Sequence, residues 1–392
     1  MSRTPRQRKP KGASLVGSRF EAEVGPVAHG GHCIVRLPEP ESRVVFVRHT
    51  MPGERVVLEI TEGTEGDSFW RADAVEILQA SPERVTPPCP YAGPGLCGGC
   101  DFQHVALGHQ RELKAAVVRE QFVRLAGFDA ADARIADLRV EGVPGDDEGL
   151  RWRTRMQYVA LPGGAKGLRA HRSNIVIEID DCRIAHPDAR VVVDGQPTDD
   201  EVIAESVATA AGTIDFQVAA DGFWQVHPGA PGALVETVLD FLAPQEGERA
   251  LDLYAGVGLF ARFLSEAVGE STRVVAIEGD RTATRYAALN LAGRERAVVA
   301  WGNVDKVLAQ GYDEPFDLVV LDPPREGARR KVVLQVVDRA PRAVAYVACD
   351  PAALARDVAT FREHGYELTR LRALDLFPMT HHVECVALLE RV

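Results

Sequence analysis

Three of the seven cysteines in this 392-residue chain fall within one twelve-residue stretch, CPYAGPGLCGGC, as Cys89, Cys97 and Cys100. Thiolates this close together are typical ligands of zinc or of an iron–sulfur cluster, both of which usually take four protein ligands. Cys182 is the favoured fourth ligand, because a chain reversal at His186 could turn it back toward the loop. Four glycines in the stretch suit a backbone that wraps closely around an inorganic core. Ligand number alone leaves zinc and iron–sulfur both open, and the pattern favours a closed structural site.

Cys349 lies in a different chemical context, between the apolar run AVAYVA and a helical pattern that starts at Pro351. A thiol next to a helix amino terminus is expected to have its pKa below the free value of about 8.5, which favours the nucleophilic thiolate. The alternative is a buried core cysteine, a common location for this residue. Glu384, in HHVECVALL, alternates with its neighbours and so faces the other way from Cys385. By itself this pattern indicates an exposed charge on an edge strand.

Polar residues also end four apolar runs that read as strands. LDLYAGVGLF has Tyr254 and a turn with Gly256 and Gly258, and the next three runs end at Glu278, Asn303 and Asp322. Glycines let the backbone approach a ligand, and a carboxylate at the second strand end accepts hydrogen bonds from ribose hydroxyls. The turn lacks the third glycine of the dinucleotide fingerprint, which argues against a nicotinamide cofactor. Arg325 follows Asp-Pro-Pro in place of an aromatic residue, which argues against methylation of an exocyclic amine.

The elements that must position these residues fall into four segments. A basic tail covers 1–16, and β-rich alternation broken by glycine and proline turns predicts a small OB-like barrel over 17–79. Mixed helix and strand signals cover 80–213, which reads as a central α+β domain carrying the cysteine loop. Strands and helices alternate over 214–392, which predicts an α/β domain, and its last two strands form a hairpin typical of the class I, Rossmann-like methyltransferase fold.

The net charge of −12 argues against a polyanionic partner, since nonspecific nucleic-acid affinity depends on Lys and Arg. The basic tail, together with Arg151, Arg153 and Arg155 at a spacing that places all three on one face of a strand, still allows a basic track for RNA. The amino terminus has no apolar signal region, and no segment is apolar enough to span a bilayer. We therefore expect a soluble, cytoplasmic protein with no membrane partner.

Taken together, the four cysteines and the segments LDLYAGVGLF, LDPPREG, YVACDPAALARDV and HHVECVALL resemble the RNA uridine-5-methyltransferase family nearly end to end. The resemblance implies that the barrel is a TRAM domain and that Cys89, Cys97, Cys100 and Cys182 hold a [4Fe–4S] cluster. It implies contacts to S-adenosylmethionine from Gln225 in FWQVHPGA and from Tyr254, Glu278, Asn303 and Asp322. It further implies Cys349 as nucleophile and Glu384 as base. Because a base inside an RNA stem is unreachable, we expect the target to be a looped or flipped-out uridine of rRNA or tRNA, and we expect the enzyme to be a monomer.

Three residues depart from the family pattern. Asp350 and His227 stand where the family commonly has Asn, and Leu259 stands where some members have a cofactor-contacting Asn. These departures leave the target nucleotide open. Two other classes of function also stay open at this point: a class I methyltransferase acting on a protein or small molecule, and a non-catalytic RNA-binding factor.

Overall fold

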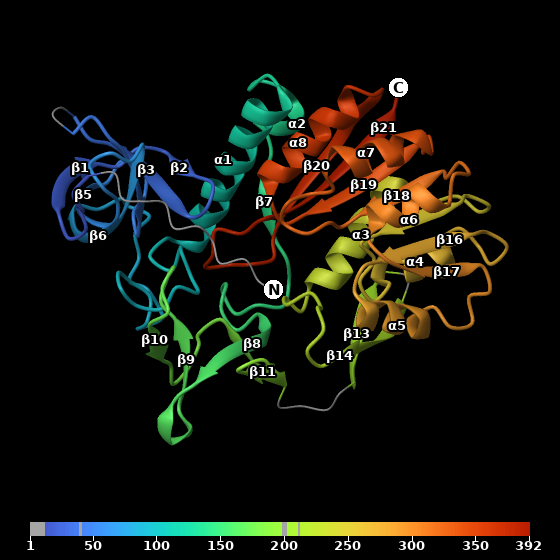
Figure 1. Cartoon of the computed structure of the whole chain (residues 1–392), viewed down its shortest axis with the longest axis horizontal. Helices are drawn as coiled ribbons and strands as arrows, with labels where there is room; N and C mark the ends of the chain where they lie inside the picture. Colours follow the sequence, from blue (N-terminus) through green and yellow to red (C-terminus); the bar gives the residue numbers. More distant parts are fainter. Residues whose placement is uncertain (1–11, 39–40, 198–201, 211) are drawn as a thin grey trace. The chain divides into compact units, whose positions relative to one another are not determined.

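The computed structural model describes residues 12–38, 41–197, 202–210 and 212–392 (Figure 1). The first of two compact units comprises Met1–Leu113, Gly167–Ile179 and Met379–His381, and the second comprises Lys114–Lys166, Asp180–Pro378 and His382–Val392. Most of the predicted basic tail, residues 1–11, lies outside the described residues. The division into four segments stays a prediction.

The first unit contains the predicted β-rich region. Its six-stranded sheet has the order β1-β5-β6-β4-β3-β2. The strands are β1 (Arg19–Glu23), β2 (Val27–Ala28), β3 (His32–Arg36), β4 (Val44–Arg48), β5 (Arg55–Glu62) and β6 (Phe69–Gln79). Alternate residues point inward, so that Val56, Leu58 and Ile60 of β5 are buried while the residues between them are not. This alternation confirms the period-two pattern of the sequence.

The cysteine loop follows β6 in the same unit. It lies against the turn between β9 (Lys166–Arg169) and β10 (Val176–Glu178), where Cys97 forms an isolated bridge with Ala170. The chain then passes into the second unit within α1 (Leu107–Ala126).

The second unit is built on an eight-stranded sheet of order β17-β16-β15-β18-β19-β21-β20-β7. The strands are β15 (Ala250–Leu253), β16 (Val274–Glu278), β17 (Ala297–Trp301), β18 (Leu318–Leu321), β19 (Ala343–Ala348), β20 (Tyr366–Asp375), β21 (Glu384–Arg391) and β7 (Val140–Gly142). The first five pair in parallel, and β21 runs antiparallel between β19 and β20. This order confirms the predicted class I fold. The pairing of β7 with β20 at the sheet edge was not predicted.

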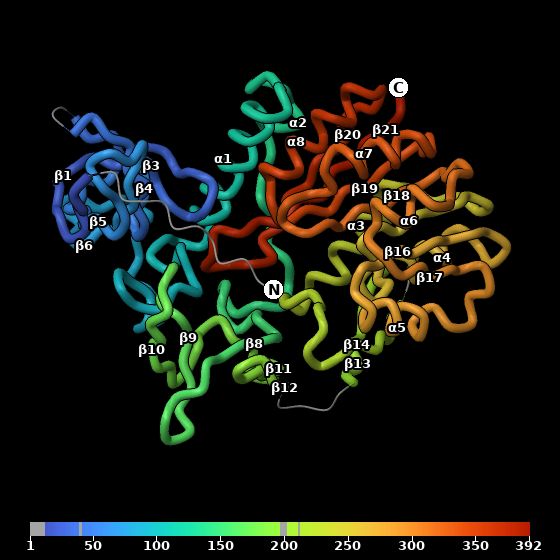
Figure 2. The backbone as a smooth tube through the Cα atoms, in the orientation of Figure 1, coloured from blue at the N-terminus to red at the C-terminus, as the bar shows by residue number. Residues whose placement is uncertain are grey.

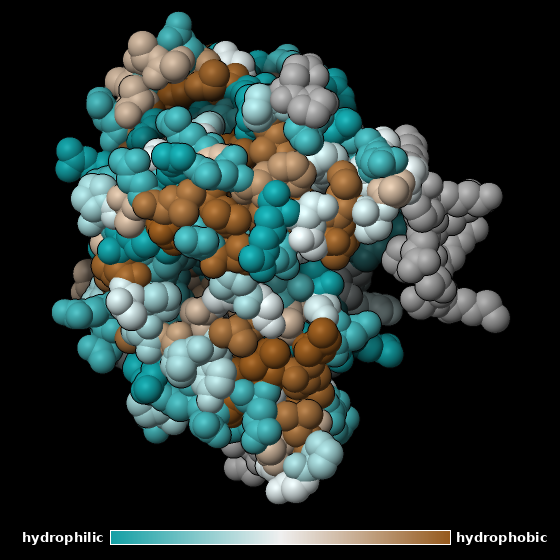
Figure 3. Space-filling model, turned by 90° about the vertical axis from the view of Figure 1, so that its left-hand side faces the viewer, coloured by the Kyte–Doolittle hydropathy of each residue, from teal (hydrophilic) through white to brown (hydrophobic). Residues whose placement is uncertain are grey.

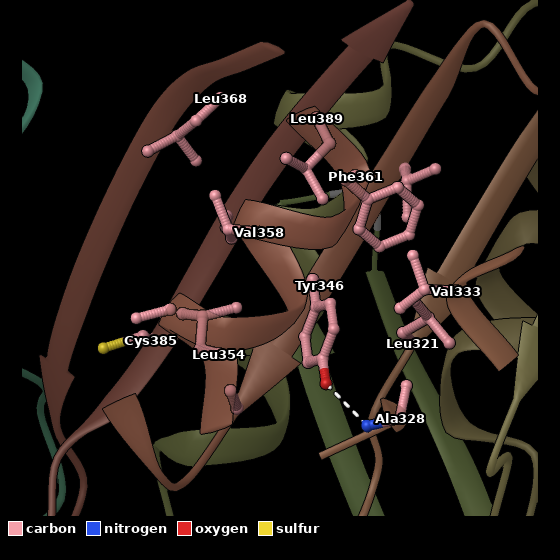
Figure 4. Close-up of a cluster of buried hydrophobic side chains, with 14 of the residues drawn as sticks. Leu321, Ala328, Val333, Tyr346, Leu354, Val358, Phe361, Leu368, Cys385 and Leu389 are labelled. Atoms are coloured by element: carbon pink, nitrogen blue, oxygen red, sulfur yellow. Dashed lines mark hydrogen bonds between the residues drawn. The ribbon is translucent and has the colours of Figure 1, made fainter. Parts of the chain in front are cut away.

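Helices cover both faces of this sheet. They are α3 (Ala230–Leu242), α4 (Leu259–Ala267), α5 (Arg281–Asn290), α6 (Val304–Gln310), α7 (Arg329–Asp338) and α8 (Pro351–Arg362), with the short α2 (Ala133–Ala136) beside β20. One buried cluster includes residues of α7 and α8, and the other includes residues of α3 and α4. Figure 4 shows part of the first cluster, with Leu354, Val358 and Phe361 of α8 packed near Tyr346 of β19. No helix in the described ranges has both the length and the hydrophobicity that a membrane crossing needs.

The remaining elements of the second unit are smaller. They are β8 (Arg153–Ala160), the 3₁₀ turn Pro162–Gly164, β11 (Ala185–Val193), β12 (Gln196–Pro197) and the hairpin of β13 (Val202–Thr209) and β14 (Gly212–Ala219), visible side by side in Figure 2. Arg151 precedes β8 with a left-handed φ of 55°, and its guanidinium binds both carboxylate oxygens of Asp181 at 2.7 and 2.6 Å. The expectation that Arg151 shares one strand face with Arg153 and Arg155 is therefore wrong.

Some large hydrophobic side chains remain at the surface, among them Phe69, Phe223 and Trp301. In the space-filling view, hydrophobic residues gather in patches between hydrophilic ones (Figure 3). Exposed aromatic side chains of this kind are suited to stacking against bases.

Candidate active site

The polar residues predicted at strand ends meet at one edge of the large sheet. Register pairs Leu253 of β15 with Ile277 of β16 on one side and with Leu321 of β18 on the other. Glu278 ends β16 and Asp322 directly follows β18, so both lie at the carboxyl ends of parallel strands. Ligands of open α/β sheets bind at this edge.

Strand alternation also places these groups on a common face of the sheet. Along β19, Val344, Tyr346 and Ala348 belong to one buried cluster, while Ala345 and Val347 belong to the other. Cys349 continues the second series. By the same alternation Asp322 and Glu384 share its face, which is the face covered by α3 and α4.

Cys349 and Glu384 lie across from each other at the end of the antiparallel pair. Ala348 of β19 faces Cys385 of β21, so the next residue along β19 meets the preceding residue of β21. The strand-to-helix turn after Cys349 is fixed by Asp350, whose carboxylate accepts a hydrogen bond of 2.8 Å from the Ala353 N–H. Asp350 thus acts as the amino-terminal cap of α8, a role that Asn also performs.

The pKa of the Cys349 thiol departs from the expectation. Burial, followed by the nearby carboxylates of Glu384 and Asp322, raises its pKa to about 12. The prediction of a pKa below the free value is therefore wrong. The amino terminus of α8 is present as predicted, but burial and two acidic neighbours have the larger effect.

Glu384 is buried, with 4 % of its surface exposed, so the alternative of an exposed edge charge is wrong. Burial and the charge of Asp322 raise the pKa of Glu384 well above its ordinary value. Burial and the charge of Glu278 raise the pKa of Asp322 to about 7. The site therefore gathers acidic groups that repel each other when ionised, an arrangement common where a cation or a proton is handled.

The glycine turn after β15 is held by Glu278. Its carboxylate accepts hydrogen bonds from the Gly256 N–H at 2.8 Å and from the Asp280 N–H at 2.6 Å. Gly256 and Gly258 have left-handed φ values of 55° and 87°, which explains glycine at both positions. Tyr254 has a φ of 65°, a strained conformation for a tyrosine that is typical of ligand sites.

Asn303 lies just after β17 and precedes α6. Its side chain is exposed and makes no capping hydrogen bond to the helix. The neighbouring Gly302 N–H donates to the Glu278 carbonyl at 2.9 Å, which fixes this strand end beside that of β16. The structure thus brings Glu278 and Asn303, two of the predicted cofactor residues, to adjacent strand ends.

Gln225 lies in the segment 221–229 between β14 and α3. Trp152, Thr154 and Arg155, at the start of β8 and just before it, contact this segment. The Thr154 N–H and hydroxyl both donate to the Val226 carbonyl, at 2.8 and 3.1 Å. The Arg155 guanidinium donates to the carbonyls of residues 221 and 222 at 2.7 and 3.0 Å. Trp152 stacks on His227 with ring centroids 6.0 Å apart. The sequence allowed Arg155 to form part of a basic track for RNA. In the structure its guanidinium instead binds backbone carbonyls of the protein.

Sequence reasoning missed Asp252, which is fully buried in β15. Its Oδ2 accepts a hydrogen bond of 2.8 Å from the Ala261 N–H, and its Oδ1 has no hydrogen-bond partner among the described residues. Burial raises the pKa of Asp252 to about 7. The only sequence feature that could have indicated Asp252 is its position as a single carboxylate within the apolar run ALDL.

The cysteine loop belongs to the first unit and Cys182 to the second. The Gly99 N–H and the Gln103 side-chain amide donate to the sulfur atoms of Cys97 and Cys100, each at 3.4 Å. Gln103 also accepts a hydrogen bond of 3.2 Å from the Cys89 N–H. Among the described residues, no group of three or more His, Cys, Asp or Glu side chains is arranged as a metal site.

Comparison with known proteins gives three matches to family models. They are a tRNA (uracil-5-)-methyltransferase model over residues 302–392, a methyltransferase small domain model over 233–346 and a TRAM domain model over 13–72. The first of these covers the segment that contains Asp322, Cys349 and Glu384. The TRAM match confirms the prediction made for the barrel.

Relatives also match this chain over nearly its whole length. An RNA methyltransferase of Streptomyces avermitilis, described as uncharacterized, is 45% identical over 430 residues, which cover 96% of this chain and 99% of the relative. The 23S rRNA (uracil(1939)-C(5))-methyltransferase RlmD of Alkalilimnicola ehrlichii is 30% identical over 95% of this chain and 96% of its own length. This chain belongs to the RNA uracil-5-methyltransferase family. It is therefore an S-adenosylmethionine-dependent RNA (uracil-5-)-methyltransferase, and both alternative classes fall away.

The fold of this RNA uracil-5-methyltransferase also has a counterpart among solved structures. The Pyrococcus abyssi tRNA (uracil-54, C5)-methyltransferase in complex with S-adenosyl-L-homocysteine superposes with a TM-score of 0.68 and 21% identity, covering 94% of this chain and 100% of that one. The similarity supports the architecture described above.

Proposed function

We propose that this enzyme converts a uridine in a structured rRNA or tRNA to 5-methyluridine through a covalent bond between Cys349 and carbon 6 of uracil. The single observation that carries the proposal is the register of β19 and β21, which sets Cys349 opposite the buried Glu384. A nucleophile and a base on the same face of one sheet can act on the two adjacent carbons of one ring.

The residues divide the chemistry as follows. The Cys349 thiolate adds to carbon 6, and the electron pair of the C5–C6 double bond moves onto the ring as an enolate. S-adenosylmethionine, when bound, would supply the methyl group that carbon 5 acquires, and S-adenosylhomocysteine would be the leaving group. Glu384, in its ionised carboxylate form, then removes the proton from carbon 5, the double bond re-forms, and the bond between carbon 6 and sulfur breaks to return the Cys349 thiolate.

The acidic surroundings of Cys349 fit a cationic cofactor. Burial and the charges of Glu384 and Asp322 raise the pKa of its thiol to about 12. A sulfonium group carries a positive charge, which opposes the repulsion from these carboxylates and so favours the thiolate. We assign cofactor contacts to Asp322 and to the other predicted residues, Gln225, Tyr254, Gly256, Gly258, Glu278 and Asn303.

The RNA partner, we propose, binds the outer face of β3, β4 and β6. The Arg71 guanidinium lies over the rings of Phe46 and Phe69, 5.8 and 5.3 Å from their centroids, and the two rings are 5.2 Å apart. Phe69 is 40% exposed, and Arg36 is exposed on the same face. Aromatic and arginine side chains together suit unpaired nucleotides, which matches a uridine that is looped or flipped out. We expect the enzyme to act as a monomer in the cytoplasm.

We also propose that Cys89, Cys97, Cys100 and Cys182 hold a [4Fe–4S] cluster with a structural role. Three thiols on one glycine-rich loop, two of them accepting N–H donors, fit a set of thiolates that carry negative charge. Zinc is the competing occupant, because it accepts the same four ligands. The cluster would connect chain segments, and no step of methyl transfer uses it.

The direct experiment is methyl transfer from tritiated S-adenosylmethionine to bacterial total RNA, followed by nucleoside analysis. The proposal expects the label in 5-methyluridine, and label in any other nucleoside would contradict it. A Cys349→Ala variant serves as the matched control and is expected to bind S-adenosylhomocysteine but to transfer nothing.

A further inference from the structure

A buried tyrosine and aspartate lie beneath the loop that follows Asp322. Tyr346 of β19 has no exposed surface, and Asp357 of α8 is 5% exposed. The Tyr346 hydroxyl donates a hydrogen bond of 2.6 Å to Oδ2 of Asp357. In Figure 4 the same hydroxyl points at the backbone nitrogen of Ala328, at the end of that loop.

Both side chains accept hydrogen bonds from backbone N–H groups of this loop. The Ala328 N–H donates to Asp357 Oδ2 at 2.8 Å and to the Tyr346 hydroxyl oxygen at 2.9 Å, and the Arg329 N–H donates to the same Oδ2 at 3.1 Å. Gly327 has a φ of 79°, and a Cβ at this position would lie 2.6 Å from that oxygen. Only glycine allows the loop to approach the pair this closely.

The loop is also strained where the pair holds it. Arg329 has a left-handed φ of 68°, which is uncommon for a residue with a side chain. Such a conformation persists only where surrounding contacts determine it, and two N–H groups bound to one buried carboxylate provide them. Burial raises the pKa of Tyr346 well above its ordinary value, so its hydroxyl stays a donor at neutral pH.

The pair connects two parts of the active site. Tyr346 belongs to β19, which ends directly before Cys349, and Asp357 belongs to the helix that starts just after Cys349. The loop they bind begins at Asp322 and carries Arg325, whose guanidinium lies 3.3 Å from Nε2 of His382. The strand and helix that present the nucleophile are therefore hydrogen-bonded to the loop that presents Asp322.

We propose that Tyr346 and Asp357 are positioning residues that hold the loop 322–329 in register with Cys349. The inference rests on the proposed roles of Cys349 and Asp322. Neither Tyr346 nor Asp357 touches substrate in this account. They act by fixing where the loop's side chains lie, and small displacements of reacting groups are costly in rate.

The test compares Tyr346→Phe with Tyr366→Phe. Tyr366 is a matched control because it is 1% exposed and its hydroxyl donates a hydrogen bond of 2.8 Å to the Pro341 carbonyl, away from the loop. The melting temperature should fall by a similar amount in both variants. Only Tyr346→Phe should lower kcat for methyl transfer to RNA, by on the order of tenfold to a hundredfold.

A second readout does not depend on activity. Hydrogen exchange at the Ala328 amide should be faster in Tyr346→Phe by roughly fivefold to tenfold, and unchanged in Tyr366→Phe. Should Tyr346→Phe not fold, Asp357→Asn is the second variant, and it should lower kcat in the same direction. Wild-type kcat in Tyr346→Phe, or an equal loss in Tyr366→Phe, would overturn the inference. If the wild-type enzyme labels no uridine, the proposed function fails, while exchange at Ala328 still decides whether the pair holds the loop.

Discussion

Replacing Asp322 by Asn should stabilise the fold at alkaline pH although it impairs the enzyme. The pKa of this carboxyl is raised from 3.8 to about 7 by burial and by Glu278. A raised pKa means that the folded state binds the proton more tightly than the unfolded state. Ionising the group therefore costs stability, and this cost grows as the pH rises from about 4 to about 7.

The pKa difference sets the size of the effect. Between 3.8 and about 7 it corresponds to at most about 4 kcal/mol of unfolding free energy. Asn has nearly the same shape and no charge, so Asp322→Asn should recover up to that amount at pH 8 and almost none at pH 4. This gain would reflect the stability that active sites commonly sacrifice for function.

Urea denaturation of wild type and Asp322→Asn at pH 4, 6 and 8 measures the difference. Glu326→Gln is the control, because Glu326 is exposed and its pairing with Arg329 at 2.9 Å lies at the surface, where such pairs contribute little. A difference between Asp322→Asn and wild type that does not change with pH, or that shrinks as the pH rises, would refute the reasoning.

Three further predictions concern separate parts of the chain. Arg155→Gln removes two hydrogen bonds that hold the Gln225 segment and should weaken S-adenosylhomocysteine binding on the order of tenfold in calorimetry, whereas Arg370→Gln, which loses a surface contact, should not. Cys182→Ala should remove the visible absorption and the bound iron of anaerobically purified protein, whereas Cys33→Ala should keep both; equimolar zinc without iron in the wild type would contradict the cluster. Phe69→Ala should weaken RNA binding roughly tenfold at fixed salt without changing cofactor affinity, and an unchanged RNA affinity would remove this face from the account.

The strand ends of the large sheet were predictable because each buried strand reads as an apolar run that stops at a polar residue. Glu278, Asp322 and Cys349 were found in this way, and their common edge follows from parallel pairing. The edge strand β7 was missed, since its three residues pair with β20 from more than two hundred residues away. No local pattern contains that information.

Tertiary surroundings also explain the corrections at Cys349 and Arg155. The helix next to Cys349 was predictable from Asp350-Pro351, but the raised pKa of its thiol depends on burial and on Glu384 and Asp322 from other strands. Arg155 has the sequence context of a surface strand, and only the folded chain shows its guanidinium bound to backbone carbonyls. Charge patterns in a sequence indicate partners only when the charges remain exposed.

The most direct test of the central claim is whether Glu384→Gln accumulates a covalent complex with RNA. This variant keeps Cys349 and the cofactor site but lacks the base, so addition and methyl transfer can proceed while release of the cysteine stalls. The variant is incubated with RNA and S-adenosylmethionine and run on a denaturing gel. The proposed mechanism predicts a slow band that requires the cofactor and disappears in the Cys349→Ala, Glu384→Gln double variant. Normal turnover by Glu384→Gln, or a band that survives the loss of Cys349, would contradict it.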